Sequence, residues 1–253
     1  MTELSDALSG AQIYDLEQPR HEGAPVWPAH APGVLLKLHR RHEPGLGART
    51  SASALLVMAE HSGTHVDALC HQAENLVLYG GVPVDAEVQT PDGFTQLGTD
   101  TMPPLLARGV LLDCADAGHA IGAEDLERAA EGLEITPGDV ILVRTGAGKL
   151  WGDPDAFLAC GGIDASGSRW CAEREPLAVG ADNIAWDVPG QDDPELGSLP
   201  GHLILLAREG IYIVEGLNLE ALARDGVREF AFACLPLKLR GGTGSPVRPI
   251  ALV

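Results

Sequence analysis

Short apolar runs separated by glycine and proline dominate the hydrophobic pattern of the chain. Continuous runs rich in Val, Ile and Leu predict buried strands at 109–114, 139–144, 183–187 and 211–215. Apolar residues with helical spacing, in two cases followed by a glycine, predict short helices at 123–131, 202–209 and 219–224. Because strands and helices alternate, the pattern is typical of an α/β domain.

The two ends of the chain are less regular. We expect an irregular N-terminal arm over 1–50, because residues 11–50 are rich in Pro, Gly, His and Arg, with short strands near 13–16 and 34–38. A strand at 54–59 follows, then a loop at 75–98. The pattern leaves 153–180 undecided and predicts a long strand at 230–239 and a final strand near the C-terminus. With no repeat or linker composition, we expect one domain over 1–253.

Composition narrows the class of protein. The chain of 253 residues has 45% hydrophobic and 21% charged residues, which is ordinary for a globular domain. Its formal charge of −19 disfavours nucleic acids and anionic membranes as partners. The first residues lack the pattern of a signal peptide, and no apolar stretch is long enough to cross a bilayer. Five cysteines without a CxxC pair fit a reduced, cytoplasmic protein.

The most informative motif is His61-Ser-Gly-Thr-His65-Val-Asp67, followed by His71. Gly63 and the neighbouring Thr and Val disfavour a helix, and in an extended strand residues 61, 63, 65 and 67 point to one side. Two imidazoles and a carboxylate then converge beside a glycine. These are ligands that Zn²⁺, Mn²⁺ or Fe²⁺ accepts. The motif therefore predicts a metal site, although a lone histidine is more often a surface or core residue.

Two distant residues are candidates to complete such a site. His202 opens an otherwise apolar helix, and Glu215 ends an apolar strand, where a carboxylate is costly unless it is paired or bound to a cation. A solvent-exposed helix residue and a salt bridge are the alternatives, and the spacing leaves them open. Cys70 beside His71 is a weak candidate for a Cys–His nucleophile because adjacent side chains usually face apart.

The motif resembles the signature of the metal-dependent cyclase-like hydrolases, the family of bacterial kynurenine formamidase and isatin hydrolase. The resemblance covers nearly the whole chain. It includes Tyr14-Asp-Leu16, Pro25-Val-Trp27-Pro28, Gly180-Ala-Asp182, Glu215-Gly-Leu-Asn218-Leu-Glu220 and Gly241-Gly-Thr-Gly-Ser-Pro246, whereas Trp186-Asp187 departs from the usual pattern.

The resemblance implies a fold and a site. The fold is a swivelling β/β/α domain, a mixed sheet with flanking helices and an extended N-terminal arm, assembled as a homodimer or homotetramer. The implied metal ligands for one or two Zn²⁺ or Mn²⁺ ions are His61, His65, Asp67, His202 and Glu215. His71 matches the general acid/base, with a ligand or ligand-orienting role as the alternative. Trp27 matches an aromatic residue of the substrate pocket, and Tyr79 and Trp186 are further candidates for its wall.

The implied activity is hydrolysis of the C–N bond of a small amide, formamide or cyclic amide by a metal-activated water. The long arm and the loop at 72–98 resemble the isatin hydrolase branch more than kynurenine formamidase. Because the same water attacks ester carbonyls, a lactone hydrolase or a biosynthetic cyclase or dehydratase is an alternative. A non-catalytic metal-binding scaffold is a third reading, which the complete ligand set disfavours.

Overall fold

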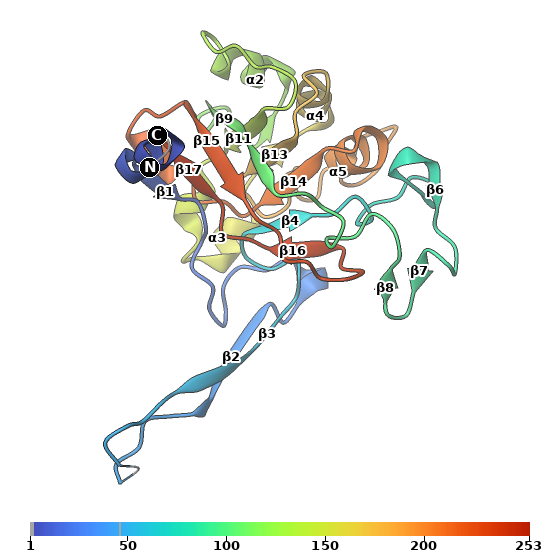
Figure 1. Ribbon diagram of the computed structural model, residues 1–253. Coiled ribbons are helices and arrows are strands. Elements are labelled where there is room, and N and C mark those ends of the chain that lie inside the picture. The colour runs from blue at the N-terminus through green and yellow to red at the C-terminus, as the bar shows by residue number, and fades with distance from the viewer. Residues whose placement is uncertain (1–2, 46) are drawn as a thin grey trace.

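The computed structural model describes residues 3–45 and 47–253 and is built around one curled sheet of nine strands (Figure 1). In spatial order the strands are β1 (Ile13–Asp15), β17 (Ile250–Leu252), β15 (Glu229–Cys234), β9 (Leu105–Asp113), β11 (Val140–Arg144), β13 (Ala178–Ala181), β14 (Tyr212–Glu215), β4 (His65–Asp67) and β16 (Gly244–Pro246).

The centre of the sheet is parallel and its two sides are antiparallel. Strands β9, β11, β13 and β14 run parallel, while β4 pairs antiparallel with both β14 and β16. The parallel strands are buried on both faces, which explains why they appear in the sequence as unbroken apolar runs. A mixed α/β sheet with flanking helices is therefore confirmed.

Most of the helices cover one face of the sheet. Helices α2 (Ala123–Ala129) and α4 (Ala165–Ala172) pack there beside α5 (Pro200–His202), which continues as a π-helix over Leu203–Glu209. Trp170, Leu205 and Leu206 belong to this face's apolar cluster. The opposite face is covered by α6 (Glu220–Arg224) and by the curled outer strands, with Phe230 and Phe232 in its core. The short helices α1 (Glu3–Gly10) and α3 (Pro154–Leu158) lie outside these two layers.

The strands predicted near 34–38 and at 54–59 are present and form a hairpin, a pairing that the hydrophobic pattern did not predict. Strands β2 (Val34–Arg40) and β3 (Ser53–Met58) pair only with each other and extend away from the body (Figure 1). Several smaller strand pairs and bridges lie outside the nine-stranded sheet. They join β5 (Val77–Leu78) to β6 (Val82–Pro83), β7 (Gln89–Thr90) to β8 (Gly93–Phe94), and β10 (Ala120–Ile121) to β12 (Gly162–Ile163) in three two-stranded sheets, with Glu17 bridged to Leu217.

Three element predictions need correction. The strand predicted at 183–187 is a turn, because β13 ends at Ala181 and Trp186 adopts a left-handed backbone with φ of 46°. The strand predicted at 230–239 ends at Cys234, two residues before Pro236, which has no N–H to donate to a neighbouring strand. The helix predicted at 123–131 ends at Ala129.

Within residues 3–45 and 47–253, none of the helices combines the length and apolar character that spanning a membrane requires.

Candidate metal centre

Antiparallel pairing of two strands places the first ligand candidates side by side. In the register of β4 and β14, His65 lies directly opposite Glu215, and Asp67 lies opposite Ile213. His202 enters the same space from the last residue of α5. The structure thus brings together the five side chains predicted as ligands, all of them at most 5% exposed: His61, His65, Asp67, His202 and Glu215.

The motif reaches this arrangement without being one extended strand, which corrects the sequence interpretation. Strand β4 begins only at His65, and residues 61–64 form a turn in which Gly63 has φ of +65°. The guanidinium of Arg20 donates hydrogen bonds to the carbonyls of Ser62 and Thr64 on both sides of that glycine. A β-carbon at Gly63 would lie 2.7 Å from the same guanidinium, so the turn requires glycine for space as well as for conformation.

In each of the three imidazoles, one ring nitrogen makes a hydrogen bond that fixes the ring. The other ring nitrogen then faces the carboxylates of Asp67 and Glu215. His65 Nδ1 donates to the carbonyl of Gly63 at 2.8 Å, and His202 Nδ1 donates to Asp187 Oδ2 at 2.7 Å. His61 Nε2 donates to Thr243 Oγ1 at 2.8 Å, and the Thr243 hydroxyl in turn donates to Glu60. Metal-binding histidines are typically fixed by such an outer partner.

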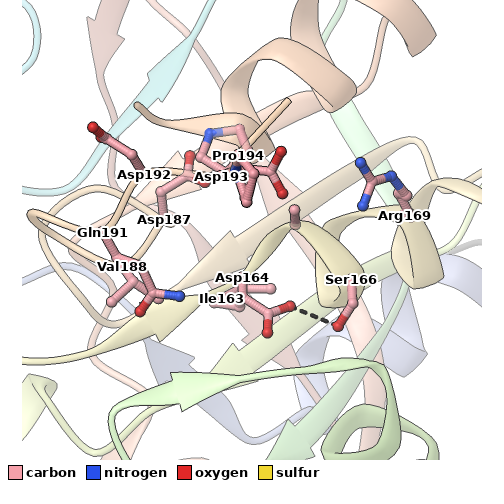
Figure 2. Close-up of a pocket in the computed structure, with 12 residues that line it drawn as sticks. Ile163, Asp164, Ser166, Arg169, Asp187, Val188, Gln191, Asp192, Asp193 and Pro194 are labelled. Atoms are coloured by element: carbon pink, nitrogen blue, oxygen red, sulfur yellow. Dashed lines mark hydrogen bonds between the residues drawn. The ribbon is translucent and has the colours of Figure 1, made fainter. Parts of the chain in front are cut away.

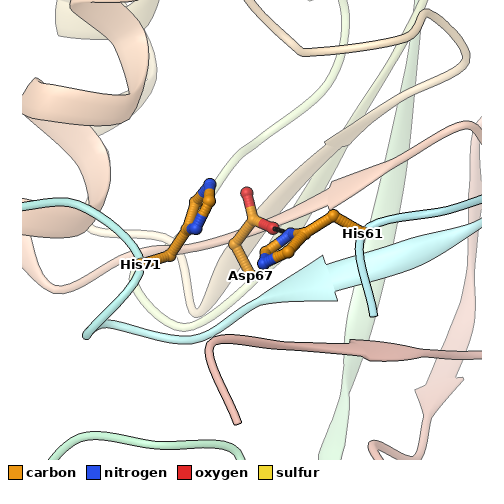
Figure 3. A group of neighbouring side chains, drawn as sticks. All are labelled: His61, Asp67 and His71. Atoms are coloured by element: carbon orange, nitrogen blue, oxygen red, sulfur yellow. Dashed lines mark ion pairs between the residues drawn. The ribbon is translucent and has the colours of Figure 1, made fainter. Parts of the chain in front are cut away.

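The free nitrogens surround two buried carboxylates. His65 Nε2 lies 3.3 Å from Glu215 Oε2, and His202 Nε2 lies 3.3 Å from Glu215 Oε1 and 3.5 Å from Asp67 Oδ2. His61 Nδ1 lies 2.8 Å from Asp67 Oδ1, the ion pair drawn in Figure 3.

Both Asp67 oxygens and Glu215 Oε1 are buried without a hydrogen-bond partner. Buried charge of this kind is costly unless a cation binds it, so the donor set fits a divalent ion. The described residues form two overlapping ligand groups, His61–Asp67–His71 and His65–Asp67–Glu215, in which the ligand atoms lie within 4.8 Å of one another. Asp67 belongs to both groups, which is the geometry of a carboxylate that can bridge two ions.

In this cluster, burial and the neighbouring charges shift the pKa values of His202 and Asp67 in opposite directions. Burial lowers the pKa of His202, but the nearby carboxylates of Asp187, Asp67 and Glu215 outweigh this effect and raise that pKa well above its usual value. Burial raises the pKa of Asp67, but the neighbouring imidazoles His71, His61 and His202 bring it well below the usual range. The protein therefore holds Asp67 as an anion, the form that binds a cation.

His71 lies at the edge of the cluster and is only partly buried. Its ring stacks on that of His61, with centroids 4.0 Å apart, and Figure 3 shows both rings beside the Asp67 carboxylate. Burial lowers the pKa of His71 to about 3, so the imidazole is neutral at pH 7. Neutral imidazole can accept a proton or bind a metal ion, and both roles proposed from the sequence are compatible with this position.

A pocket of about 210 Å³ opens onto the cluster. Its wall comprises Trp27, Ala29, His30, His61, His65, His71, Gln72, Ile184, Ala185, Leu199, His202 and Glu215. Trp27 thus lines the pocket and also packs against a small apolar cluster around Trp151. Sequence reasoning missed His30, whose ring stacks on His61 at 4.9 Å, because nothing distinguishes it from the other histidines of the arm.

Neither of the other aromatic candidates lies in this wall. Tyr79 packs over Gly210, where an added β-carbon would lie 2.4 Å from its ring. Trp186 is completely buried and donates from Nε1 to Ser168 Oγ at 3.0 Å. Of the loop that follows the motif, only Gln72 reaches the pocket.

Asp187 connects the cluster to a second cavity. Its carboxylate accepts hydrogen bonds from the backbone N–H groups of Gly201 (2.6 Å) and His202 (3.1 Å) and from the His202 ring. A separate pocket of about 220 Å³ lies beside Asp187, with Asp164, Arg169 and Asp192 in its wall (Figure 2). The second cavity contains none of the candidate ligands.

The cysteines take no part in the cluster. Burial raises the pKa of the Cys70 thiol to about 12, and its Sγ contacts the carbonyl of Gly242 rather than His71. Cys234 is buried at the end of β15, and Cys114 is buried directly after β9. A Cys–His nucleophile is therefore not formed by these residues.

A family model, curated relatives and a solved structure all match this chain to the same protein family. A family model named "Cyclase" and described as "Putative cyclase" matches residues 14–188. Isatin hydrolase of Roseibium aggregatum is 31% identical over 212 residues, which cover 78% of this chain and 73% of that protein. Kynurenine formamidase of Bordetella petrii is 26% identical over 94% of this chain and 97% of its own length. The solved structure of a novel cyclase superposes with a TM-score of 0.84 at 30% identity and covers 98% of this chain and 88% of its own.

The matched segment contains the whole histidine motif, and the structural match covers 98% of the chain, which contains both His202 on α5 and Glu215 on β14. The chain therefore belongs to the cyclase family, with the family's mixed α/β fold.

Proposed function

We propose that this protein is a metal-dependent hydrolase that cleaves the C–N bond of a small amide, formamide or cyclic amide. The observation that carries the proposal is the group of three buried carboxylate oxygens that accept no hydrogen bond and are surrounded by three imidazoles. Two of the relatives are an isatin hydrolase and a kynurenine formamidase, and these names support a C–N bond as the target.

The residues that would hold one or two ions of Zn²⁺ or Mn²⁺ are His61, His65, Asp67, His202 and Glu215. A bound divalent ion lowers the pKa of water toward neutrality and polarises a carbonyl group. The chain orients the ligands through Gly63, Thr243 and Asp187, so that their free nitrogens are aimed before an ion arrives.

We assign His71 as the general acid/base. Its ring belongs to one of the two groups of possible metal ligands, yet it is more exposed than the other imidazoles of the cluster and lines the pocket. A neutral imidazole there can take a proton from the attacking water and deliver it to the leaving nitrogen. Because His71 also groups with His61 and Asp67, a ligand role is the alternative, and metal content of a variant distinguishes the two.

The pocket favours a small substrate. At about 210 Å³ it is smaller than the roughly 300–1,000 Å³ of pockets for drug-sized ligands. Trp27 and Ile184 offer apolar surface for a ring, and Gln72 and His30 offer polar contacts. The greater identity to isatin hydrolase among the relatives described supports that branch.

The test begins with metal content and then activity. We expect about one or two equivalents of Zn or Mn per chain by elemental mass spectrometry of protein purified without added metal or chelator. We also expect hydrolysis of isatin or N-formylkynurenine in preference to small lactones. Protein that neither contains nor takes up these metals would contradict the proposal, and preference for lactones would change the substrate class to esters.

Two variants separate the assigned roles. His71→Ala should retain metal and lose roughly two to four orders of magnitude in kcat, whereas Asp67→Asn should lose metal and activity together. His39→Ala is the matched control, because His39 is exposed on the hairpin and bonds only to Ser53. Loss of metal in His71→Ala would instead make His71 a ligand.

A further inference from the structure

The turn at residues 61–64 brings two of the candidate ligands together. In an extended strand His61 and His65 would lie roughly 13 Å apart, since each residue advances the chain by about 3.3 Å. In the structure their ring centroids are 5.2 Å apart. His61 Nδ1 lies 2.8 Å and His65 Nε2 lies 3.6 Å from the same oxygen, Asp67 Oδ1. The candidate metal centre therefore depends on the conformation of this turn.

The guanidinium of Arg20 holds the turn from outside the cluster. Its Nη1 donates to the carbonyl of Ser62, and its Nη2 donates to the carbonyl of Thr64. The carbonyl between these two, that of Gly63, stays available to His65 Nδ1. A planar guanidinium suits two carbonyls on either side of one residue, because its donors form a rigid fork.

Arg20 is itself fixed in place by its neighbours. Its side chain is only 14% exposed. Its Nε donates to Glu17 Oε1 at 2.6 Å, and its Nη2 also donates to the carbonyl of Val247 at 3.2 Å. Arg20 is not part of the pocket wall that the described residues form, so it acts on the centre only through the turn.

The same segment of the N-terminal arm ties the turn to the end of β14. The backbone N–H of the buried Gln18 donates to Thr64 Oγ1 at 2.9 Å, and the Thr64 hydroxyl donates to the carbonyl of Gly216 at 2.7 Å. Gly216 directly follows Glu215, the last residue of β14. Residues 17–20 thus hold the turn and this strand end in a fixed relative position.

We propose that Arg20 is a positioning residue of the candidate metal centre. It holds the turn in the conformation that aims His61 and His65 at Asp67, and it acts through backbone carbonyls. This role rests on the proposed function, since it concerns the ligands of the proposed ion. Charge alone gives the opposite expectation, because a cationic side chain repels a divalent ion and its removal would then tighten metal binding.

The first measurement uses metal-free protein and follows the ring N–H signals of histidines by heteronuclear NMR. The Nδ1–H of His65, bonded to the Gly63 carbonyl, should exchange with solvent at least about tenfold faster in Arg20→Ala, because the turn loses hydrogen bonds to a charged group. The Nδ1–H of His202, bonded to Asp187, is the internal reference and should be unchanged in a folded variant.

The second measurement is the affinity for Zn²⁺ or Mn²⁺ in competition with a fluorescent chelator. Arg20→Ala should raise the dissociation constant by about 10- to 100-fold, the usual effect of losing a group that orients a ligand. Arg248→Ala is the matched control and should bind metal like the unaltered protein. Arg248 carries the same charge, but its side chain is 70% exposed and pairs with Asp15 at 2.7 Å.

A second variant, Arg20→Lys, decides the question if Arg20→Ala fails to fold. The lysine keeps the positive charge and can still pair with Glu17, but a single ammonium group lacks the fork that reaches both carbonyls. It should therefore weaken metal binding several-fold and speed exchange at His65 Nδ1–H, although the net charge is unchanged.

A His65 signal that stays as protected in the Arg20 variants as in the unaltered protein would overturn the role of Arg20. So would a metal affinity of Arg20→Ala that equals or exceeds that of Arg248→Ala. An unaltered protein that binds neither Zn²⁺ nor Mn²⁺ would instead contradict the proposed function, and the metal-free His65 signal would still decide whether Arg20 holds the turn.

Discussion

Asp187 affects the candidate metal centre through His202 without lining its pocket. Its carboxylate accepts three hydrogen bonds, from the N–H groups of Gly201 and His202 and from the His202 ring. The ring bond fixes Nδ1 as the protonated nitrogen and leaves Nε2 for an ion. A residue in this position controls ligand orientation and is not itself a ligand.

We predict that Asp187→Asn weakens metal binding by about 10- to 100-fold, because an amide cannot replace every hydrogen bond that the carboxylate accepts. Competition with a fluorescent zinc chelator measures the affinity. Asp192→Asn is the matched control, since Asp192 lines the neighbouring pocket and is exposed. Equal affinities for the two variants would show that Asp187 does not orient His202.

Single residues also show how far the sequence allowed prediction. The ligand candidates of the motif stand out because His and Asp are concentrated within a few positions, and the structure brings all of them together. Asp187, Thr243 and His30 carry no such signal. Each is one of many residues of its type, and only the fold places it beside a ligand.

At the scale of elements, the short helix α5 positions His202 by packing closely on Trp186. Gly201 has no space for a side chain, because a β-carbon there would lie 2.6 Å from Trp186 Cδ1 and 2.7 Å from Ser168 Oγ. Trp186 is itself held in a left-handed conformation with φ of 46°. The two features together set where the helix begins and where His202 points.

We therefore predict that Gly201→Ala destabilises the fold by roughly 1–3 kcal/mol, the usual cost of adding a methyl group to a packed core, and weakens metal binding as α5 moves. Urea unfolding and metal titration measure the two effects. Gly152→Ala should be close to neutral in both, because an added β-carbon at Gly152 has no neighbour within 4 Å. An unchanged Gly201→Ala protein would mean that α5 tolerates displacement.

Elements whose pattern was local were predicted well, and those that depend on distant pairing were not. The strands at 109–114, 139–144 and 211–215 are apolar because they are covered on both faces, and the structure confirms them within a few residues. The motif was interpreted as one strand, yet only His65–Asp67 is paired. The strand begins only at His65 because residues 61–64 form a turn at Gly63 that contacts Arg20, and no local pattern reveals this contact.

At the scale of the whole molecule, the centre joins the sheet to α5 and to the N-terminal arm. Buried carboxylate oxygens of Asp67 and Glu215 accept no hydrogen bond from the protein, and a bound ion would neutralise their charge. An ion that binds only the folded state stabilises that state by mass action. At a free ion concentration of 100 times the dissociation constant, the free energy of unfolding increases by about 2.7 kcal/mol.

We predict that removal of metal by a chelator lowers the melting temperature by roughly 5–10 °C for a chain of this length. Differential scanning fluorimetry with and without EDTA measures the change, and readdition of Zn²⁺ or Mn²⁺ should restore it. An Asp67→Asn protein should not respond to EDTA. If the melting temperature of the unaltered protein is the same with EDTA, without EDTA and after readdition of metal, then metal does not stabilise its fold.

The position of β4 between β14 and β16 has a consequence for how the protein is made in a cell. Strand β4 is synthesised early, but its neighbours lie roughly 150 and 180 residues later in the chain. At about 5–20 residues per second, the ribosome delivers β14 on the order of ten seconds after β4. During that interval the nascent chain contains the histidine motif without Glu215 or His202. The ligand set is therefore complete only after β14 has been synthesised.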